Sequence, residues 1–333
     1  MVIVAEDVGV PVDATGTVAP MPVVLDTRTA PAPGDVGTAL SSCRHGRYDP
    51  TTRLVRTGAA ASSTGEFVRA ARTVDGPGTV HVRWQHGDSI TVLGAWGPGA
   101  DRLRDQVPTM AGSEDRGAPE LLTAPHPVIA AAAQAHRHVR LGRTGDPYAE
   151  LLPTIIEQRI TAGEALRQWA GLCRLLGDAA PGPFEGLLLP PAPDVLATTP
   201  YWRLHRLGIE RKRAAALIEV ARHADKIARW AELTASDAGT RLALLRGVGA
   251  WTIGNVLRVA WGDPDAVAVG DYHHKNTVAW SLAGEPRGSD ERMMELLEPY
   301  RGQRGRVVQL LGASGGHAPA FGPKQRILPM RDW

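Results

Sequence analysis

The chain has 333 residues, more than one typical domain, so we expect two packed modules. Apolar residues make up 43% and charged residues 22%, as in globular proteins, and a formal net charge of +2 does not by itself indicate a nucleic-acid partner. The two cysteines, Cys43 and Cys173, lie far apart, which excludes a zinc site or iron–sulfur cluster built on cysteine. The first ten residues lack the basic start of a signal peptide, and no run approaches the ~20 apolar residues of a membrane-spanning helix. We therefore expect a cytoplasmic protein without membrane contact.

The first part of the chain predicts an extended segment followed by a small sheet. Residues 1–42 are rich in Pro, Gly, Thr, Val and Ala, and their apolar runs, Val2–Val4 and Met21–Leu25, are compatible with edge strands or an extended arm. From Leu54 on, polar and apolar residues alternate, which predicts antiparallel strands over Glu66–Arg72, Thr79–Gln85 and Ser89–Leu93. We expect a turn at Asp75–Gly78, an end to the strands at Gly94–Gly99 and a helix after Ala100. Residues 43–125 are thus predicted to form an α/β domain.

Residues 126–311 have apolar residues at helical spacing and predict a helical domain. The expected helices are Val128–His138, Ala149–Ile160, Gly163–Leu176, Asp194–Thr198, Tyr201–Leu207, Glu210–Trp230, Ser236–Leu245, Thr252–Trp261, Tyr272–Leu282, Asp290–Leu297 and Gly305–Leu311. Four tryptophans at helical positions are expected in the core: Trp202, Trp230, Trp261 and Trp280. Residues 312–333 are predicted to be a basic tail, for which phosphate contact and a solvated terminus are both open. The fold class predicted is α+β, with a mostly helical second part.

Two of the expected helices are joined by Gly247-Val248-Gly249. Ser236 is the expected N-cap of the first helix, and the second begins near Thr252. Glycine permits positive φ and close approach of another backbone, and Val248 can fill the gap between the helices. The free amides of the second helix's first turn then form an anion site suited to a DNA phosphate. An ordinary helical hairpin with a glycine C-cap would have the same pattern.

Asp271 follows the hairpin by about 20 residues, in the sequence Gly270-Asp271-Tyr272-His273. The apolar run Ala266–Val269 precedes it and a helical pattern follows, so Asp271 is expected at a helix N-terminus beside hydrophobic chain. The roles of N-cap and of reactive carboxylate are both open, because one capping oxygen leaves the other free. The helix N-terminus favours the ionised carboxylate and burial opposes it.

A third segment, Glu157-Gln158-Arg159-Ile160-Thr161, completes an ordered set of motifs. The set resembles the helix-hairpin-helix DNA glycosylase superfamily and is most similar to its 3-methyladenine (alkylpurine) DNA glycosylase II branch. The matching residues are Glu157–Thr161, Leu245–Thr252 and Gly270–Tyr272, and the similarity runs from Pro127 to Leu311. The resemblance implies a helix-hairpin-helix glycosylase core preceded by a small antiparallel sheet-and-helix domain.

The resemblance implies base excision repair, in which a damaged, alkylated purine is flipped out of the duplex and its N-glycosidic bond is hydrolysed. Asp271 matches the family's catalytic aspartate, which stabilises the oxocarbenium-like transition state. Members that also cut the strand carry lysine where this chain has Trp251, which implies a monofunctional enzyme without lyase activity. Trp251, Tyr272 and Asn255 are the expected base-pocket residues. Core packing stays open for Trp251, and Asn255 departs from an aromatic residue frequent at its position.

The resemblance also assigns contacts with the partner, double-stranded DNA that contains a damaged base. Arg159, beside Gln158, is the expected wedge, although the branch more often has an apolar residue there. The hairpin residues expected at a phosphate are Arg246, Gly247, Val248, Gly249 and Thr252, followed by His273 and Lys275 after Asp271. The carbonyls of Leu245 and Val248 match positions that hold a monovalent cation, Na⁺ or K⁺, and no other cofactor is expected. A monomer in the bacterial cytosol, associated with the nucleoid when bound to DNA, is predicted.

Three alternatives remain at this point. A non-catalytic or altered-specificity reader of damaged DNA would keep the hairpin, and Arg159 and Asn255 leave this possible. A glycosylase for deaminated or oxidised purines, or for a bulky adduct, would keep Asp271 and change the pocket. A helical scaffold that binds protein would make the ordered motifs a coincidence.

Overall fold

The computed structural model describes residues 29–31, 34–58, 63–85 and 89–319. The apolar runs Val2–Val4 and Met21–Leu25, and the tail from residue 320 onward, lie outside these ranges. Within them, no helix is long and apolar enough to cross a membrane.

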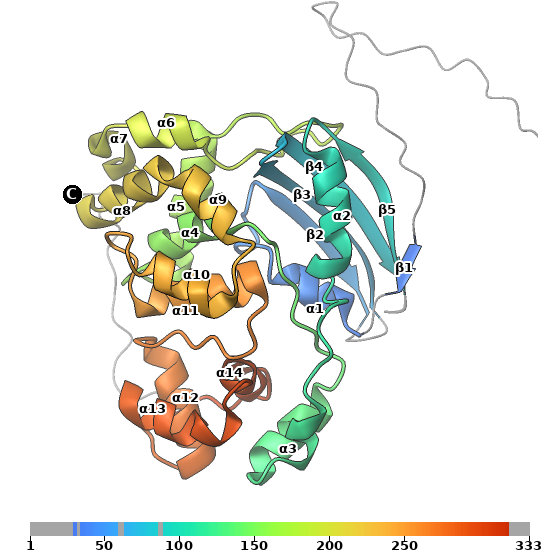
Figure 1. Cartoon of the computed structure of the whole chain (residues 1–333), viewed down its shortest axis with the longest axis vertical. Helices are drawn as coiled ribbons and strands as arrows, with labels where there is room; N and C mark the ends of the chain where they lie inside the picture. The colour runs from blue at the N-terminus through green and yellow to red at the C-terminus, as the bar shows by residue number, and fades with distance from the viewer. Residues whose placement is uncertain (1–28, 32–33, 59–62, 86–88, 320–333) are drawn as a thin grey trace, which may run out of the picture.

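A five-stranded antiparallel sheet forms the N-terminal part of the fold (Figure 1). Its strands are β1 (Thr29–Pro31), β2 (Thr52–Thr57), β3 (Thr64–Thr73), β4 (Gly76–Gln85) and β5 (Ser89–Trp96), in the order β1-β5-β4-β3-β2. Helices α1 (Val36–Ser41) and α2 (Ala100–Met110) share a hydrophobic core with one face of this sheet. The α+β prediction is confirmed, and the strands arise where polar and apolar residues alternate.

Two details of the sheet differ from the expectation. The turn takes only Val74 and Asp75, because Gly76 adopts a φ of +117° and lets β4 begin at once. Strand β5 does not end at Gly94 but continues to Trp96. A Cβ at Gly94 would lie 2.6 Å from the indole of Trp96, so the glycine accommodates that ring inside the strand.

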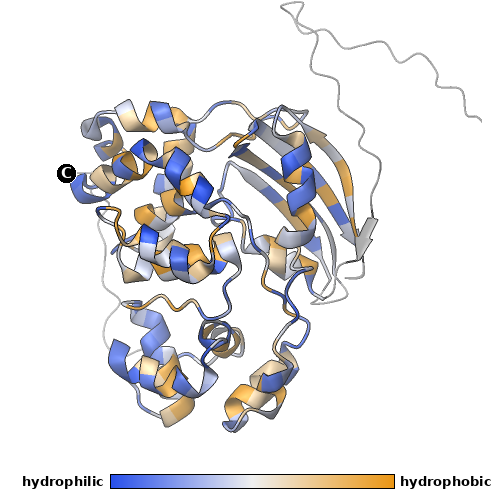
Figure 2. Ribbon diagram, in the orientation of Figure 1, coloured by the Kyte–Doolittle hydropathy of each residue, from blue (hydrophilic) through white to orange (hydrophobic). Residues whose placement is uncertain are grey.

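Strand β3 is buried on both of its faces. Phe67 and Ala71 point into the core beneath α1 and α2, whereas Val68 and Ala70 pack on the opposite face. There they meet Leu187 and Leu189, which belong to the proline-rich loop between α5 and α6. This loop therefore ties the sheet to the helices, and the alternating colours along the strands in Figure 2 show the same periodicity.

The remainder of the described chain is helical. Its helices are α3 (Pro127–Ala135), α4 (Pro147–Glu157), α5 (Ala162–Leu176), α6 (Pro193–Thr198), α7 (Tyr201–His205), α8 (Arg211–Arg222), α9 (Ala224–Trp230), α10 (Ala235–Leu242), α11 (Ala250–Val256), α12 (Tyr272–Ala283), α13 (Asp290–Leu297) and α14 (Arg304–Ala313). A π-helical turn, Leu257–Trp261, continues α11, and short 3-10 turns occupy Pro119–Thr123 and Glu298–Tyr300.

These helices enclose two separate cores. The larger is formed by α4 to α11 and includes Leu151, Leu217 and Val256. The smaller joins α3 to α12–α14 through Ile129 and Val307, so α3 packs with helices far from it in sequence. Figure 1 shows α3 and α12–α14 together at the bottom of the view, below α10 and α11. The chain between Trp261 and α12 crosses from one core to the other and carries Asp271.

Two expectations about where the helices begin and end were wrong. The helix predicted over 210–230 is two helices, because the ring Nδ1 of His223 lies 2.9 Å from the carbonyl oxygen of Glu219 and the backbone N–H of His223 turns to Val220. Helix α10 is capped by Thr234, whose hydroxyl accepts from Asp237 N, and not by Ser236.

Trp202 and Trp280 are 59% and 38% exposed rather than buried. The reason at Trp202 is that the five-residue helix α7 buries only Leu204. Trp230 and Trp261 do pack against the larger core. Cys43 and Cys173 are buried free thiols.

Candidate functional site

The hairpin between α10 and α11 depends on one glycine rather than two. Gly247 has a φ of +88°, and a Cβ there would lie 2.6 Å from the Cβ of Ala216 on α8. Gly249, the N-cap of α11, has a φ of −103° and open space where a Cβ would point. Val248 is buried in the larger core, as expected. Because Gly249 and Ala250 are exposed, the amides at the start of α11 face solvent and can meet an anion.

Gln158 braces the hairpin from the turn between α4 and α5. Its side-chain amide donates to the Gly247 carbonyl and to the Thr252 hydroxyl, both at 2.9 Å. Thr252 is 2% exposed. The side chains of Gln158 and Thr252, predicted to contact DNA, therefore contact each other, and they fix the angle between the turn and the hairpin.

Arg159 stands at the tip of the same turn in a strained backbone conformation. Its φ of 59° is the only positive value among the described non-glycine residues, and its side chain is exposed. Behind it, the buried Arg213 donates to the Ile156 carbonyl at 2.7 Å and to Gln168 Oε1 at 2.8 Å. Arg213 thereby holds the end of α4 against α5. Sequence reasoning missed it, because an arginine on a helix is usually exposed.

Asp271 caps α12 and uses both carboxylate oxygens. Oδ1 accepts from the backbone N–H groups of His273 and His274 at 2.8 and 3.0 Å. Oδ2 accepts the indole N–H of Trp251 at 2.9 Å. Partial burial works against ionisation, but the hydrogen bond from Trp251, the ring of His274 and the two amides together hold the pKa of Asp271 below its usual range. The carboxylate is therefore ionised at neutral pH.

Two residues that sequence reasoning did not single out position Asp271. A Cβ at Gly254 in α11 would lie 2.3 Å from the carbonyl oxygen of Val267, so only glycine allows this close approach. Asp290 accepts the Gly270 N–H at 3.1 Å and pairs with Lys275 Nζ at 3.7 Å. Lys275, expected at a phosphate, is thus held by a carboxylate. Gly254 could have been found from the sequence, because a glycine inside an apolar helix often marks a close approach of another backbone.

Trp251, Asn255 and Arg258 share one face of α11 and its π-helical continuation. The Asn255 side-chain amide donates to the Trp251 carbonyl at 2.9 Å. A cavity of about 280 Å³ lies farther along this face and is lined by Asn255 and Arg258. Its other lining residues come from the end of α1 and the segment that follows it, from α4, from α5 and from the π-helical turn: Ser41, Ser42, Arg44, His45, Gly46, Glu150, Thr154, Glu157, Leu166 and Val259. Trp251 and Asp271 are not part of this lining.

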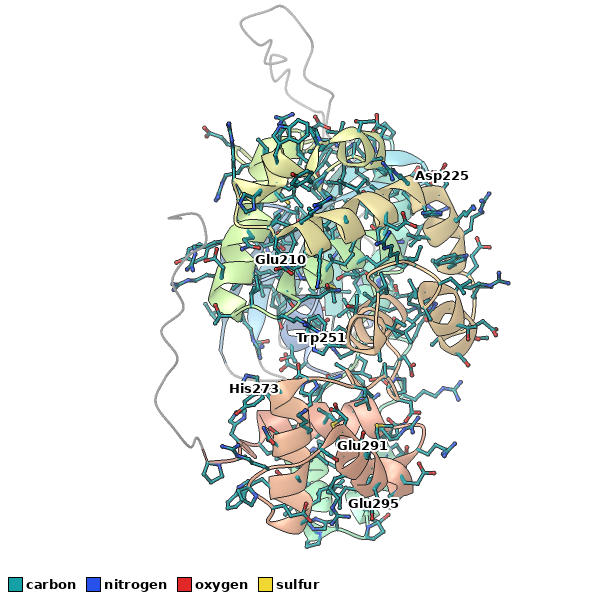
Figure 3. All side chains as sticks on the ribbon, turned by 90° about the vertical axis from the view of Figure 1, so that its left-hand side faces the viewer. Glu210, Asp225, Trp251, His273, Glu291 and Glu295 are labelled. Atoms are coloured by element: carbon teal, nitrogen blue, oxygen red, sulfur yellow. The ribbon has the colours of Figure 1, made fainter. Side chains whose placement is uncertain are left out.

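Tyr272 and His273 are exposed, with ring centroids 5.3 Å apart in an edge-to-face contact. Figure 3 shows His273 at the end of α12, close to Trp251 at the boundary between the two helical groups. Neither Tyr272 nor His273 lines the cavity, so the structure does not place Tyr272 with Asn255. Arg246 is also exposed, at the hairpin.

The fold of this chain is similar to those of solved DNA glycosylases. A 3-methyladenine DNA glycosylase from Archaeoglobus fulgidus superposes with a TM-score of 0.67 at 17% identity, over 85% of this chain and 96% of that one. An 8-oxoguanine glycosylase/lyase from Clostridium acetobutylicum, solved with double-stranded DNA, gives a TM-score of 0.57 at 16% identity, over 78% and 86%. The chain has the helix-hairpin-helix DNA glycosylase fold. No protein-family profile and no curated protein sequence matches it.

In this glycosylase fold, the hairpin carbonyls were predicted to hold a monovalent cation. The Leu245 carbonyl accepts the Val248 N–H at 3.1 Å, which closes the turn. Among the described residues, no cluster of histidine, cysteine, aspartate or glutamate has the arrangement of a metal site. The cation at Leu245 and Val248 remains a prediction.

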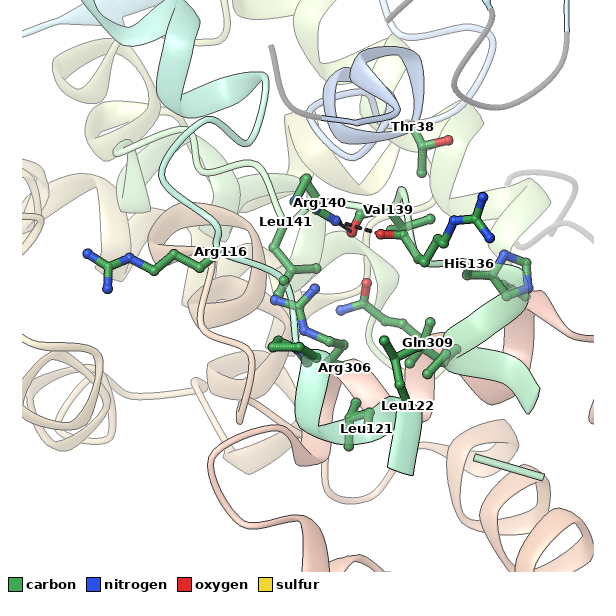
Figure 4. Close-up of a pocket in the computed structure, with 17 residues that line it drawn as sticks. Thr38, Arg116, Leu121, Leu122, His136, Val139, Arg140, Leu141, Arg306 and Gln309 are labelled. Atoms are coloured by element: carbon green, nitrogen blue, oxygen red, sulfur yellow. Dashed lines mark hydrogen bonds between the residues drawn. The ribbon is translucent and has the colours of Figure 1, made fainter. Parts of the chain in front are cut away.

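Two further hollows lie outside the Asp271 region. A groove of about 1160 Å³ beside the hairpin is lined by Tyr201, Trp202, Arg211, Lys212, Arg222 and Arg246, among others. A cavity of about 330 Å³ between α3 and α14 contains Arg140, Arg306 and Gln309 (Figure 4). Arg306 is bound to Asp115, and Arg140 donates to the Val139 carbonyl. The cavity of Figure 4 contains no predicted site residue.

Proposed function

We propose that the chain is a DNA N-glycosylase that hydrolyses the glycosidic bond of a damaged base flipped out of duplex DNA, with Asp271 as the catalytic carboxylate. The observation that carries this proposal is the fixed, ionised state of Asp271 next to a hairpin suited to phosphate. Three donors hold the carboxylate, and a carboxylate has about four acceptor positions, so Oδ2 keeps one for the reaction. Positive charge develops on the sugar as the bond breaks, and an immobile anion stabilises it without reorganisation.

The rest of the site supports the handling of DNA. The exposed amides at the start of α11 and the exposed Arg246 offer contacts to one phosphate. Arg159, held at a positive φ on a braced turn, is suited to enter the space that a flipped base leaves. The groove beside the hairpin adds basic side chains and the exposed rings of Tyr201 and Trp202, a combination that favours nucleic acid.

We propose that the reaction is monofunctional, with water as the nucleophile. By the resemblance to the helix-hairpin-helix glycosylases, Trp251 matches the position at which members with lyase activity carry lysine. Its indole N–H is bound to Asp271. The amine of Lys275 is paired with Asp290. A free amine that could attack C1′ and form a Schiff base is therefore not expected at Asp271. Action as a monomer in the bacterial cytosol belongs to the same proposal.

The test is base release from duplex oligonucleotides that carry single lesions, compared between wild type and Asp271→Asn. We expect the substitution to lower release by about 10²–10⁴-fold and to leave DNA affinity within about threefold. Asp225→Asn, at an exposed aspartate in the first turn of α9, serves as the matched control. Abasic sites should give strand breaks only after alkali. Release that survives Asp271→Asn would overturn the catalytic assignment, and breaks without alkali would overturn the monofunctional one.

A further inference from the structure

The cavity beside α11 is charged, although the base pocket of an alkylpurine enzyme is expected to be aromatic. It lies on the Asn255–Arg258 face of α11 and its π-helical continuation, one to two turns beyond Trp251, the residue bound to Asp271. Its volume of about 280 Å³ suits a ligand the size of a nucleobase. Asn255, in the cavity lining, donates to the carbonyl of Trp251, and the indole N–H of Trp251 donates to Asp271, so two hydrogen bonds link the cavity to the carboxylate. If the proposed function holds, this cavity receives the flipped base.

One set of its charged groups is already paired within the protein. Glu150 forms an ion pair with His45 at 3.2 Å and accepts a hydrogen bond from Arg69 at 3.3 Å. Burial opposes charge on His45, but its hydrogen bond to Glu150 raises the pKa of the imidazole above its usual value. The backbone N–H of His45 is held by Asp49 at 3.0 Å, and Asp49 also accepts the indole N–H of Trp169 at 3.0 Å. These contacts fix the His45 and Glu150 side chains in place as one wall of the cavity.

A second set has no partner. In the described part of the chain, neither the Arg258 guanidinium nor the Glu157 carboxylate makes a hydrogen bond or an ion pair, and the two are not within 4.0 Å of each other. Both side chains line the same cavity, and each acts on the other's charge. Asn255 uses its amide N–H on Trp251 and keeps its oxygen free. Partly buried ionic groups without partners are costly, and a ligand between them would satisfy both.

We propose that Arg258 and Glu157 recognise a neutral oxopurine, a base with a carbonyl group next to an N–H, as in hypoxanthine, xanthine and 8-oxoguanine. Arg258 donates to the carbonyl oxygen, and Glu157 accepts the adjacent N–H. This deepens the proposed function and replaces the alkylated purine that the resemblance implies. A cationic alkylated base would meet the Arg258 charge in a poorly solvated space, and 3-methyladenine lacks the carbonyl. Guanine paired with cytosine shares the edge but resists flipping more than a mispaired or damaged base does.

The experiment measures single-turnover release from one duplex sequence that carries hypoxanthine, xanthine or 8-oxoguanine, against methylated DNA of the same sequence that contains 3-methyladenine and 7-methylguanine. We expect the best oxopurine to be released at least about tenfold faster than either methylated base. Arg258→Met should lower oxopurine release by about 10–100-fold, since a hydrogen bond from a charged donor is lost, and should leave 3-methyladenine release unchanged or raised. Arg174→Met, at an exposed arginine of α5, is the matched control.

Binding to a duplex with an abasic site separates the cavity from the rest of the DNA contacts. Arg258→Met should bind this duplex as the wild type does, and Arg258→Lys, which keeps the charge, serves if the methionine variant fails to fold. Preferential release of methylated bases, insensitive to Arg258, would overturn this inference and leave the glycosylase proposal standing. Release of no base, with abasic binding intact, would overturn the proposed function itself.

Discussion

The hairpin and the charged cavity lie along one helix, α11 with its continuation, yet they are built in different ways. The hairpin is eight consecutive residues, Leu245–Thr252, and its working groups are backbone amides. The cavity brings His45, Glu157 and Arg258 together from three distant parts of the chain. A backbone phosphate is the same at every position of DNA, so a local motif suffices to hold it. A particular base must be distinguished by side chains placed around it, and that placement requires the tertiary fold.

This comparison predicts that the link between the two regions is the most sensitive point. Gly254→Ala should lower base release by about 100-fold while DNA affinity stays within about threefold, because the added Cβ pushes Val267 and displaces Asp271. Gly312→Ala in α14, where a Cβ meets nothing within 4 Å, is the control. Release rate and binding to an abasic duplex are measured for both variants. Equal losses in affinity and rate would show that the hairpin and Asp271 cannot be separated.

The second largest effect is expected on DNA affinity, and it should differ between the two glycines of the hairpin. Gly247→Ala should weaken DNA binding by about tenfold, since alanine is strained at a φ of +88° and its Cβ meets Ala216. Gly249→Ala should change affinity by less than about twofold, because its conformation and surroundings accept a side chain. Fluorescence anisotropy with an abasic duplex checks both. A larger loss at Gly249 would mean that DNA comes closer to this residue than the open space requires.

The smallest expected effect is a pH dependence confined to the cavity. Burial raises the pKa of Glu157, against the opposing charges of His45 and Arg258, with Glu150 adding to the rise. As pH falls through that raised value, Glu157 takes up a proton and loses its acceptor, so oxopurine release should fall about fivefold between pH 7.5 and 5. Asp271 stays ionised over this range, since its pKa is lowered.

Glu157→Gln isolates this effect. The variant should release oxopurines more slowly than the wild type at pH 7.5 and show a flatter pH profile. The rate of 3-methyladenine release, and its pH dependence, should be the same in the variant and in the wild type. Initial rates at five pH values check this. A profile that Glu157→Gln leaves unchanged would assign the titration to another group.

The sequence by itself determined the features that depend on neighbouring residues. The fold class, most of the strands and helices, the hairpin and the capping role of Asp271 all follow from local periodicity and local hydrogen bonding, and the structure bears them out. Local reasoning went wrong where a side chain competed with the backbone, as His223 does at the break between α8 and α9.

Tertiary structure alone decided which polar groups find partners. Gln158 and Thr252 are predicted DNA contacts that turn to each other, and Lys275 turns to Asp290. Gly254 is required only because Val267 passes over it. In the sequence, Arg258 is one more helical arginine. It becomes a candidate for base recognition because the fold places it, half-buried and without a protein partner, in the lining of a cavity. The physical reason is that hydrogen bonds and ion pairs are satisfied by whatever the fold brings within about 3–4 Å, and sequence separation does not limit that distance.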